Sequence, residues 1–188
     1  MLDASYQKSR ARIQAKAQRA GCAAIAAESA VDLISHFPAV EFRGSVISGI
    51  WPLPGELDTR PLMTALSDMG FTLALPCTPR KGQPLTFRHW DAGQPLKAGP
   101  YGTREPFLDA EVAAPTLVLV PLLAFTERGE RLGYGGGFYD RTLAELKSNY
   151  AVFACGVGFA AQEAASLPTD DHDVPLDGVL TDRYFKRF

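Results

Sequence analysis

The run Leu117-Val-Leu-Val-Pro121 is apolar at every position. This pattern is typical of a parallel strand that is buried on both faces of a sheet. We therefore expect it to form the central strand. Three further short runs, residues 45–50, 71–75 and 151–156, are also rich in apolar and β-forming residues. Helix-forming stretches separate these runs, and strands that alternate with helices predict an α/β fold with an open, mostly parallel sheet and helices on both faces.

Helical segments are expected on either side of these strands. Residues 7–37 are rich in Ala, Ile, Gln, Arg and Glu. Because most of these are strong helix formers, we expect one long helix or two helices broken near Gly21. Thr59 suits the N-cap position of a second helix, which should end near Met69. A third helix is expected over about residues 139–147.

Residues 76–106 differ in character from the rest of the chain. They contain many Gly and Pro residues around two short β-like pieces, residues 85–90 and the turn at residues 97–102. We expect a small insertion of hairpin and loop here. The whole chain of 188 residues fits one domain spanning residues 1–188, because a single α/β core of this size can bury most of its apolar surface.

Composition narrows the class of protein. With 46% hydrophobic residues, 21% charged residues and a net charge of -2, the chain is typical of globular proteins, and no basic surface is indicated for nucleic acid. No apolar run approaches the roughly 18 residues of a membrane span. Cys22, Cys77 and Cys155 are far apart and lack CxxC spacing, so neither a disulfide framework nor a zinc site is indicated. We therefore expect a cytoplasmic protein.

The most informative stretch is Arg131-Leu-Gly-Tyr-Gly-Gly-Gly-Phe-Tyr-Asp140, whose four glycines are expected to lie between a central strand and a helix start. Such a loop can turn successive backbone N–H groups toward an anion, and the helix N-terminus adds a partial positive charge. This is how proteins hold a nucleotide phosphate. A tight strand-to-helix turn without a ligand is the alternative. The run is neither a Walker loop nor a GxGxxG dinucleotide loop.

The same stretch resembles the C-terminal signature of the 5-formyltetrahydrofolate cyclo-ligase family, also called methenyltetrahydrofolate synthetases. Lys8-Ser-Arg-Ala-Arg12, followed by Arg19, is similar to the family's K-x-x-L-R-x(6)-R helix. Trp51-Pro-Leu-Pro-Gly-Glu56-Leu-Asp58 resembles the family segment whose Glu contacts the folate pterin. Residues 168–177 look like the tail segment that supplies an acidic magnesium ligand. The four elements occur in family order over essentially the whole chain.

The resemblance implies an enzyme, an ATP-dependent ligase that cyclises 5-formyltetrahydrofolate to 5,10-methenyltetrahydrofolate and releases ADP and phosphate. ATP would phosphorylate the formamide oxygen, and nitrogen-10 of the folate would then attack the activated carbon. Such a site must position two substrates and neutralise phosphoryl charge. The implied partners are these two small molecules and Mg²⁺, with no nucleic acid or membrane, and the implied assembly is a monomer or a weak dimer.

The resemblance also implies roles for particular residues. Arg131 and Tyr139 would be catalytic, and Asp140 and Asp173 would hold Mg²⁺. The implied folate-binding residues are Trp51, Glu56, Tyr101 and Tyr139. The implied ATP-binding residues are Lys8, Arg12, Arg131, Leu132, Gly133, Tyr134, Gly135, Gly136, Gly137, Phe138 and Tyr139.

The sequence departs from the family pattern at three positions. Ala11 stands where the family usually has Leu. Tyr134 and Gly136 occupy positions that are often Arg and Lys in other branches of the family. Two phosphate-binding cations are thereby missing, so either the remaining cations neutralise more of the phosphate charge or the affinity for ATP is lower.

Each assignment has a purely structural alternative. Lys8, Arg12 and Arg19 recur on one helical face, which is usually solvated. Glu56 could cap the helix that begins near Thr59. Asp140 is favoured at a helix start by the helix dipole, and the acidic cluster around His172 could be a surface loop. Of the aromatic residues that could wall a folate site, namely Trp51, Phe87, Trp90 and Tyr101, the two Trp residues could equally lie in the core.

Two other functions also remain open. One is a phosphate-binding isomerase or coenzyme A transferase on a similar α/β sheet, in which the glycine loop holds a phosphate without ATP hydrolysis. The other is a non-catalytic relative that binds folate and nucleotide without turnover, which the missing cations at Tyr134 and Gly136 would favour.

Overall fold

Strand β7 (Leu117–Pro121) lies in the middle of an eight-stranded sheet, as its apolar sequence predicts. The structure is a computed structural model and describes residues 4–23 and 33–188. Its main sheet has the strand order β12-β11-β10-β7-β1-β2-β3-β6. Strand β7 pairs in parallel with β1 (Val46–Ser48) and with β10 (Phe153–Gly158). The predicted central strand is therefore confirmed.

The outer strands extend this parallel centre on both sides. Strand β2 (Thr72–Cys77) is parallel to β1, and β11 (Gly178–Thr181) is parallel to β10. The edges are antiparallel, with β3 (Thr86–His89) and β6 (Val112–Ala113) at one edge and β12 (Phe185–Arg187) at the other. The prediction of an open, mostly parallel α/β sheet is confirmed.

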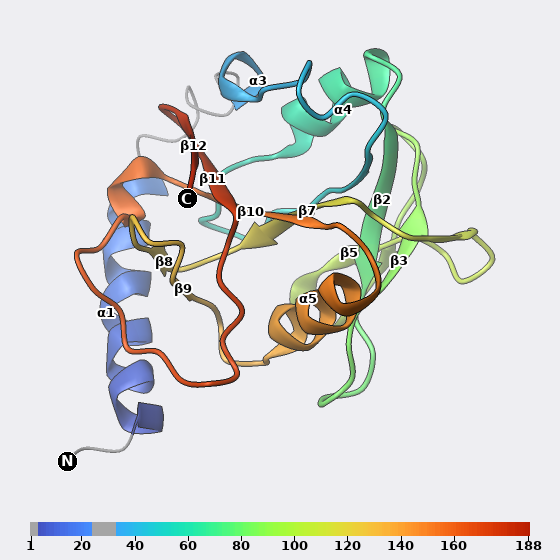
Figure 1. Cartoon of the computed structure of the whole chain (residues 1–188). Coiled ribbons are helices and arrows are strands. Elements are labelled where there is room, and N and C mark those ends of the chain that lie inside the picture. The colour runs from blue at the N-terminus through green and yellow to red at the C-terminus, as the bar shows by residue number, and fades with distance from the viewer. Residues whose placement is uncertain (1–3, 24–32) are drawn as a thin grey trace.

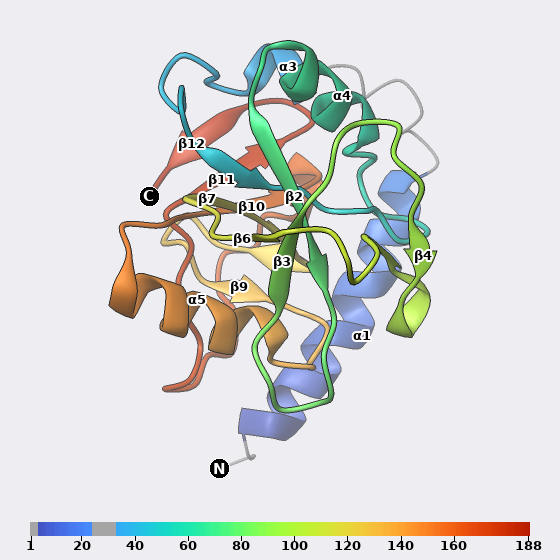
Figure 2. The same cartoon turned by 90° about the vertical axis from the view of Figure 1, so that its right-hand side faces the viewer.

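Helices cover both faces of the sheet, as predicted. Helices α3 (Leu33–His36) and α4 (Arg60–Asp68) lie over one face, and α5 (Phe138–Asn149) lies over the other (Figures 1 and 2). Helix α1 (Ala4–Ala23) runs beside β8 and β9, away from the middle of the sheet (Figure 1). The prediction of helix over residues 7–37 falls partly on residues 24–32, which lie outside the described residues.

The core explains why β7 is apolar at consecutive positions. Leu117 and Leu119 belong to the cluster that includes Leu62 of α4, whereas Val118 and Val120 pack in the cluster that includes Leu143 of α5. The first four side chains of β7, residues 117–120, are fully buried. Because alternate side chains of a strand point to opposite faces, a strand covered on both faces needs an apolar residue at every position.

The segment over residues 76–106 differs from the predicted insertion. Its first β-like piece is β3, which pairs with β2 and belongs to the main sheet. Within β3, the side chain of Phe87 is buried in the core and that of Thr86 is exposed, as expected for a strand with one face on the core. A small hairpin is present, formed by β4 (Lys97–Ala98) and β5 (Arg104–Glu105) around the 3-10 turn Pro100–Gly102.

A second two-stranded hairpin carries the chain toward the glycine stretch. It consists of β8 (Ala124–Phe125) and β9 (Arg131–Leu132). The glycines therefore follow β9 of this hairpin and not the central strand itself. A further 3-10 turn, Ala160–Gln162, follows β10 and contacts α1. Among the described residues, the structure contains no helix with both the length and the apolar character that crossing a bilayer requires.

Candidate functional site

A cleft of about 1480 Å³ lies between α1, the glycine stretch, the loop after β1 and the β4–β5 hairpin. Every residue to which the family resemblance assigned a role in binding ATP, folate or Mg²⁺ lines this cleft. These residues come from positions between Lys8 and Asp173, so the fold brings together segments from nearly the whole described chain. Three basic residues that no sequence motif indicated also line the cleft, namely Lys81, Arg104 and Arg141.

The backbone of the glycine stretch requires glycine at two positions. Gly135 has a φ of 98° and Gly137 a φ of 64°, both in the range that residues with a Cβ rarely adopt. Gly137 is the N-cap residue of α5. The stretch therefore turns sharply into the positive end of a helix, where an anion is favoured. Leu132 is buried in a small cluster with Leu123, so its backbone is what borders the cleft.

Two arginines hold the glycine stretch from outside. Nε of Arg12, on α1, donates to the carbonyl oxygen of Gly133 at 3.0 Å. Nη2 of Arg141, on α5, donates to the carbonyl oxygen of Gly136 at 2.7 Å. Because the carbonyls accept these bonds, the loop is fixed to two helices. Arg12 is thus half-buried against the loop, which contradicts the alternative of a solvated position.

Arg131 and Asp140 form an ion pair at the base of the cleft. Arg131 is buried, and it also donates to the carbonyl oxygen of Val174. The backbone N–H of Val174 donates to Oδ1 of Asp140 at 3.3 Å. Burial lowers the pKa of Arg131, and the charge of Asp140 opposes that effect. Arg131 therefore remains a cation whose position is set by one carboxylate and one carbonyl.

Lys8 is also buried, and its ammonium group contacts two carboxylates of the acidic loop. Nζ of Lys8 lies 2.7 Å from Oδ2 of Asp170 and 2.6 Å from Oδ2 of Asp173. Burial is the largest single effect and lowers the pKa of Lys8, but the hydrogen bonds with both carboxylates and their negative charges together raise the pKa overall. The alternative of a solvated helical face is therefore wrong for Lys8.

The two predicted magnesium ligands, Asp140 and Asp173, each face a cation in this structure. Within residues 4–23 and 33–188, no three His, Cys, Asp or Glu side chains are grouped so that they could hold a metal ion. Mg²⁺ commonly takes one or two carboxylates together with substrate phosphates and water. Two hard carboxylates beside the glycine stretch fit that donor set.

Glu56 is held by groups from three parts of the chain. Its Oε2 accepts the backbone N–H of Leu53 at 2.8 Å. Its Oε1 accepts the hydroxyl of Tyr134 and lies 3.6 Å from Nη1 of Arg19. At the start of α4 it is Asp58 that accepts the N–H of Arg60, at 3.0 Å. The alternative in which Glu56 caps α4 is therefore wrong.

The Tyr139 hydroxyl stays protonated at neutral pH. Burial raises the pKa of Tyr139, and the negative charge of Glu56 raises it further, while Arg131 acts in the opposite direction. A neutral phenol in the cleft can donate a hydrogen bond to a substrate oxygen.

The aromatic residues divide between the cleft and the core. Trp51 and Tyr101 line the cleft, and Tyr101 is 71% exposed with a φ of 59°. Phe87 and Trp90 are buried, and Trp90 packs edge-on against Trp51 with ring centroids 6.2 Å apart. The prediction that Phe87 and Trp90 wall the ligand site is therefore wrong, because both rings are buried in the core.

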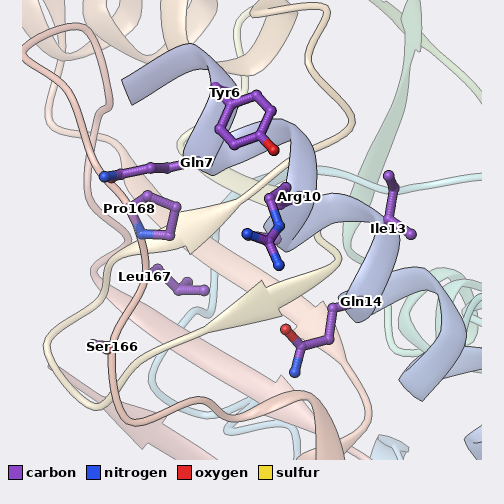
Figure 3. Close-up of a pocket in the computed structure, with 9 residues that line it drawn as sticks. Tyr6, Gln7, Arg10, Ile13, Gln14, Ser166, Leu167 and Pro168 are labelled. Carbon is purple, nitrogen blue, oxygen red and sulfur yellow. The ribbon is translucent and has the colours of Figure 1, made fainter. Parts of the chain in front are cut away.

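A second hollow of about 710 Å³ lies on the other side of α1 (Figure 3). Tyr6, Arg10, Ile13 and Gln14 reach it from the helix, and residues 166–168 border it from the neighbouring loop (Figure 3). It contains none of the residues predicted to bind ATP, folate or Mg²⁺. The cleft on the glycine side is therefore the candidate active site.

Residues 4–182 match the model of the 5-formyltetrahydrofolate cyclo-ligase family. The chain belongs to this family. A 5-formyltetrahydrofolate cyclo-ligase from Haemophilus influenzae is 34% identical over 131 residues, which cover 67% of this chain and 70% of that protein. The corresponding protein from Escherichia coli is 36% identical over 132 residues, which cover 68% and 72%.

Solved structures agree with this assignment. The NMR structure of Aquifex aeolicus 5,10-methenyltetrahydrofolate synthetase superposes with a TM-score of 0.77 at 27% identity, covering 96% of this chain and 92% of that one. A 5,10-methenyltetrahydrofolate synthetase from Mycoplasma pneumoniae shares the fold, with a TM-score of 0.70 at 19% identity. The predictions of the cyclo-ligase family, of a ligase and of ATP as its co-substrate are confirmed at the level of the family.

Proposed function

We propose that ATP and 5-formyltetrahydrofolate react in the cleft beside the glycine stretch, where the protein closes the formyl group into the methenyl bridge of 5,10-methenyltetrahydrofolate and releases ADP and phosphate. One observation carries the location. Two buried cations, Lys8 and Arg131, border the same cleft as a glycine stretch whose backbone conformation excludes most side chains. This combination of fixed positive charge and accessible backbone N–H groups suits a polyphosphate.

The nucleotide would lie along the glycine stretch. Backbone N–H groups of residues 133–137 and the N-terminus of α5 would contact phosphate oxygens. Lys8, Arg12 and Arg131 would neutralise their charge. Tyr134 and Gly136 supply no cation here, and the side chain of Tyr134 turns toward Glu56. Phosphate binding at these two positions would therefore depend on the backbone.

Asp140 and Asp173 would hold Mg²⁺, which supplies additional charge neutralisation to the phosphoryl group when it is bound. Both carboxylates would then exchange their present cations, Arg131 and Lys8, for the metal. The freed guanidinium and ammonium groups would turn to the phosphate oxygens. The resting ion pairs thus keep four charged groups close to their working positions.

The folate would lie between the loop after β1 and the β4–β5 hairpin. Glu56 would accept hydrogen bonds from the pterin nitrogens, and Trp51 and Tyr101 would contact its flat rings. Tyr139 would donate a hydrogen bond to the formyl oxygen and orient it toward the transferred phosphoryl group. A formamide oxygen is a poor leaving group until it is phosphorylated, so holding the formyl oxygen close to the γ-phosphorus of ATP, with ADP as the leaving group, is the main task of the site.

Three further proposals concern the protein as a whole. The proposed location is the cytoplasm, the proposed assembly is a monomer or weak dimer, and the proposed organisation is one domain over residues 1–188. They are supported by the net charge of -2, by the absence of a CxxC cysteine pattern in the sequence, and by a single main sheet in the described residues.

The decisive experiment follows the absorbance of the methenyl product when the protein is mixed with 5-formyltetrahydrofolate, ATP and Mg²⁺. We expect product formation that requires ATP and releases one phosphate for each product formed. Product that forms equally well without ATP would refute the proposal. Folded protein that binds both ligands and forms no product would be the non-catalytic relative instead.

A further inference from the structure

Tyr134 belongs to the glycine stretch, but its side chain contacts the other proposed substrate site. Its hydroxyl donates to Oε1 of Glu56, across 78 residues of sequence. The guanidinium of Arg19 donates to the same hydroxyl and lies over the Tyr134 ring, 5.5 Å from its centroid. Arg19 and Glu56 are themselves only 3.6 Å apart. The three side chains therefore form one connected group between the two sites.

This group fixes the orientation of the Glu56 carboxylate. One oxygen is held by the N–H of Leu53, and the other by Tyr134 and Arg19. The Glu56 and Arg19 side chains are 10% and 12% exposed, whereas Tyr134 is 38% exposed, so solvent reaches this group from the side of the tyrosine. Without the Tyr134 hydroxyl, the Oε1 atom would keep only the longer contact with Arg19.

The position of Tyr134 depends on the loop that carries it. Its neighbours are Gly133, whose carbonyl accepts a hydrogen bond from Arg12, and Gly135, whose φ is 98°. A phosphate bound to the N–H groups on either side of Tyr134 would further restrain the backbone that carries its side chain. That backbone sets where the Tyr134 hydroxyl meets Glu56.

We propose that Tyr134 is a positioning residue for the folate, which orients Glu56 and couples occupancy of the glycine stretch to folate affinity. This inference rests on the proposed function, in which Glu56 contacts the pterin. It gives a role to the position where the resemblance implied a phosphate contact and where other branches often carry a cation. In this chain the glycine stretch serves both substrates.

The test is Tyr134→Phe, which removes one hydroxyl and keeps the ring under Arg19. Dissociation constants for 5-formyltetrahydrofolate and for Mg-ADP would be measured by titration calorimetry, each with and without the other ligand. Because a hydrogen bond to a charged group is stronger than one between neutral groups, we expect folate affinity to fall by on the order of tenfold or more. The affinity for Mg-ADP should change less than about twofold, and each ligand should lose its effect on the other.

The matched control is Tyr184→Phe. The hydroxyl of Tyr184 also donates to a glutamate, Oε2 of Glu163 at 2.8 Å, but Tyr184 does not line the cleft. Tyr184→Phe should leave both affinities and their coupling unchanged. A loss of folate affinity in the control as large as in Tyr134→Phe would mean that the effect is one of general stability, and would overturn the proposal.

Two results with Tyr134→Phe would also overturn it. Tighter folate binding would mean that Tyr134 competes with the folate for Glu56. Weaker Mg-ADP binding with unchanged folate binding would return Tyr134 to the nucleotide. Glu56→Gln in the same titrations separates this proposal from the proposed function. If Glu56→Gln binds folate like the wild type, the pterin contact itself is wrong, whereas a defect in Glu56→Gln without one in Tyr134→Phe refutes only the positioning role.

Discussion

Replacing Gly135 by alanine tests the central role given to the glycine stretch, because it adds a single methyl group to the loop. Gly135 has a φ of 98°, which lies beyond the left-handed region that a residue with a Cβ can occupy. Strain of this kind amounts to about 1–3 kcal/mol. Alanine also restricts the unfolded chain, which offsets roughly 0.4–1 kcal/mol. We therefore expect a net loss of about 0.5–2 kcal/mol of stability in the protein without ligand.

The added methyl group also meets a neighbour. An ideal Cβ at Gly135 lies 3.2 Å from Cζ of Arg12, closer than an ordinary contact. The guanidinium of Arg12 must move, and its hydrogen bond to the carbonyl of Gly133 is then disturbed. Both effects change the loop that is proposed to hold the phosphates, so nucleotide binding should suffer in addition to stability.

The assay is the thermal shift given by Mg-ATP. At a ligand concentration of 100 times Kd, binding adds about 2.7 kcal/mol of stability, and a tenfold weaker Kd removes about 1.3 kcal/mol of that gain. For a protein of this size, 1 kcal/mol corresponds to roughly 2–4 °C in Tm. Gly135→Ala with a tenfold weaker Kd should thus lose about half of the Mg-ATP shift.

Gly93→Ala is the matched control for this substitution. Gly93 has a φ of 94°, no atom lies within 4 Å of its ideal Cβ, and it does not line the cleft. Its backbone strain is therefore similar, but its Mg-ATP shift should equal that of the wild type. If Gly135→Ala loses stability and still shows the full Mg-ATP shift, the glycine serves only the turn and the phosphate assignment is refuted.

Two further predictions concern ion pairs and buried thiols. Lys8→Met should reduce stability by about 1–3 kcal/mol near neutral pH, since it leaves Asp170 and Asp173 without their cation. Hydrogen bonding to Lys8 lowers the pKa of Asp170, while the pKa of Lys8 is raised. The difference in unfolding free energy between wild type and Lys8→Met should therefore be largest at pH values between the pKa of Asp170 and that of Lys8. It should shrink as pH falls through the lowered pKa of Asp170, and shrink again as pH rises through the raised pKa of Lys8. Urea unfolding across pH measures it, and a difference independent of pH would contradict the assigned pairs. Burial raises the pKa of Cys155 to about 12, so this thiol should react with a disulfide reagent only after unfolding, and rapid labelling of the native protein at Cys155 would contradict its place in the core.

The parallel centre of the fold could be predicted because each of its strands has its own local signal. Strand β7 is covered on both faces and is apolar throughout, and Thr59 lies directly before α4 as predicted. The side chain of Thr59 makes no capping hydrogen bond to α4. Its hydroxyl instead donates to the carbonyl of Ile50 at 2.6 Å, a contact that the local sequence did not indicate. Local sequence indicates where a helix begins but not which distant group a side chain selects.

The edges of the sheet were harder to predict. Strand β12 carries Lys186 and Arg187, which are exposed, so it lacks the apolar pattern of a buried strand. Strand β3 lies in a segment rich in Gly and Pro, which favours an interpretation as loop. An edge strand takes its conformation from the neighbour with which it pairs, and that neighbour is not visible in its own residues.

For the candidate site, the sequence indicated which residues gather but not how they pair. The residues assigned from the four motifs line one cleft, whereas Phe87 and Trp90, which belong to no motif, lie in the core. The pairs of Lys8 with Asp173 and of Tyr134 with Glu56 join positions 165 and 78 residues apart. Such contacts depend on the finished packing of separate elements, and no local pattern encodes them.

The contact between Lys8 and Asp173 also has a consequence for how the protein is made. Residues this far apart in sequence meet only after most of the chain has left the ribosome, and contacts of long sequence separation form slowly because a large loop must close. A nascent chain that stops before residue 170 lacks both carboxylates that pair with the ammonium group of Lys8. The cleft should therefore be among the last parts of the molecule to take shape, and a ribosome-bound chain of that length should not yet retain nucleotide.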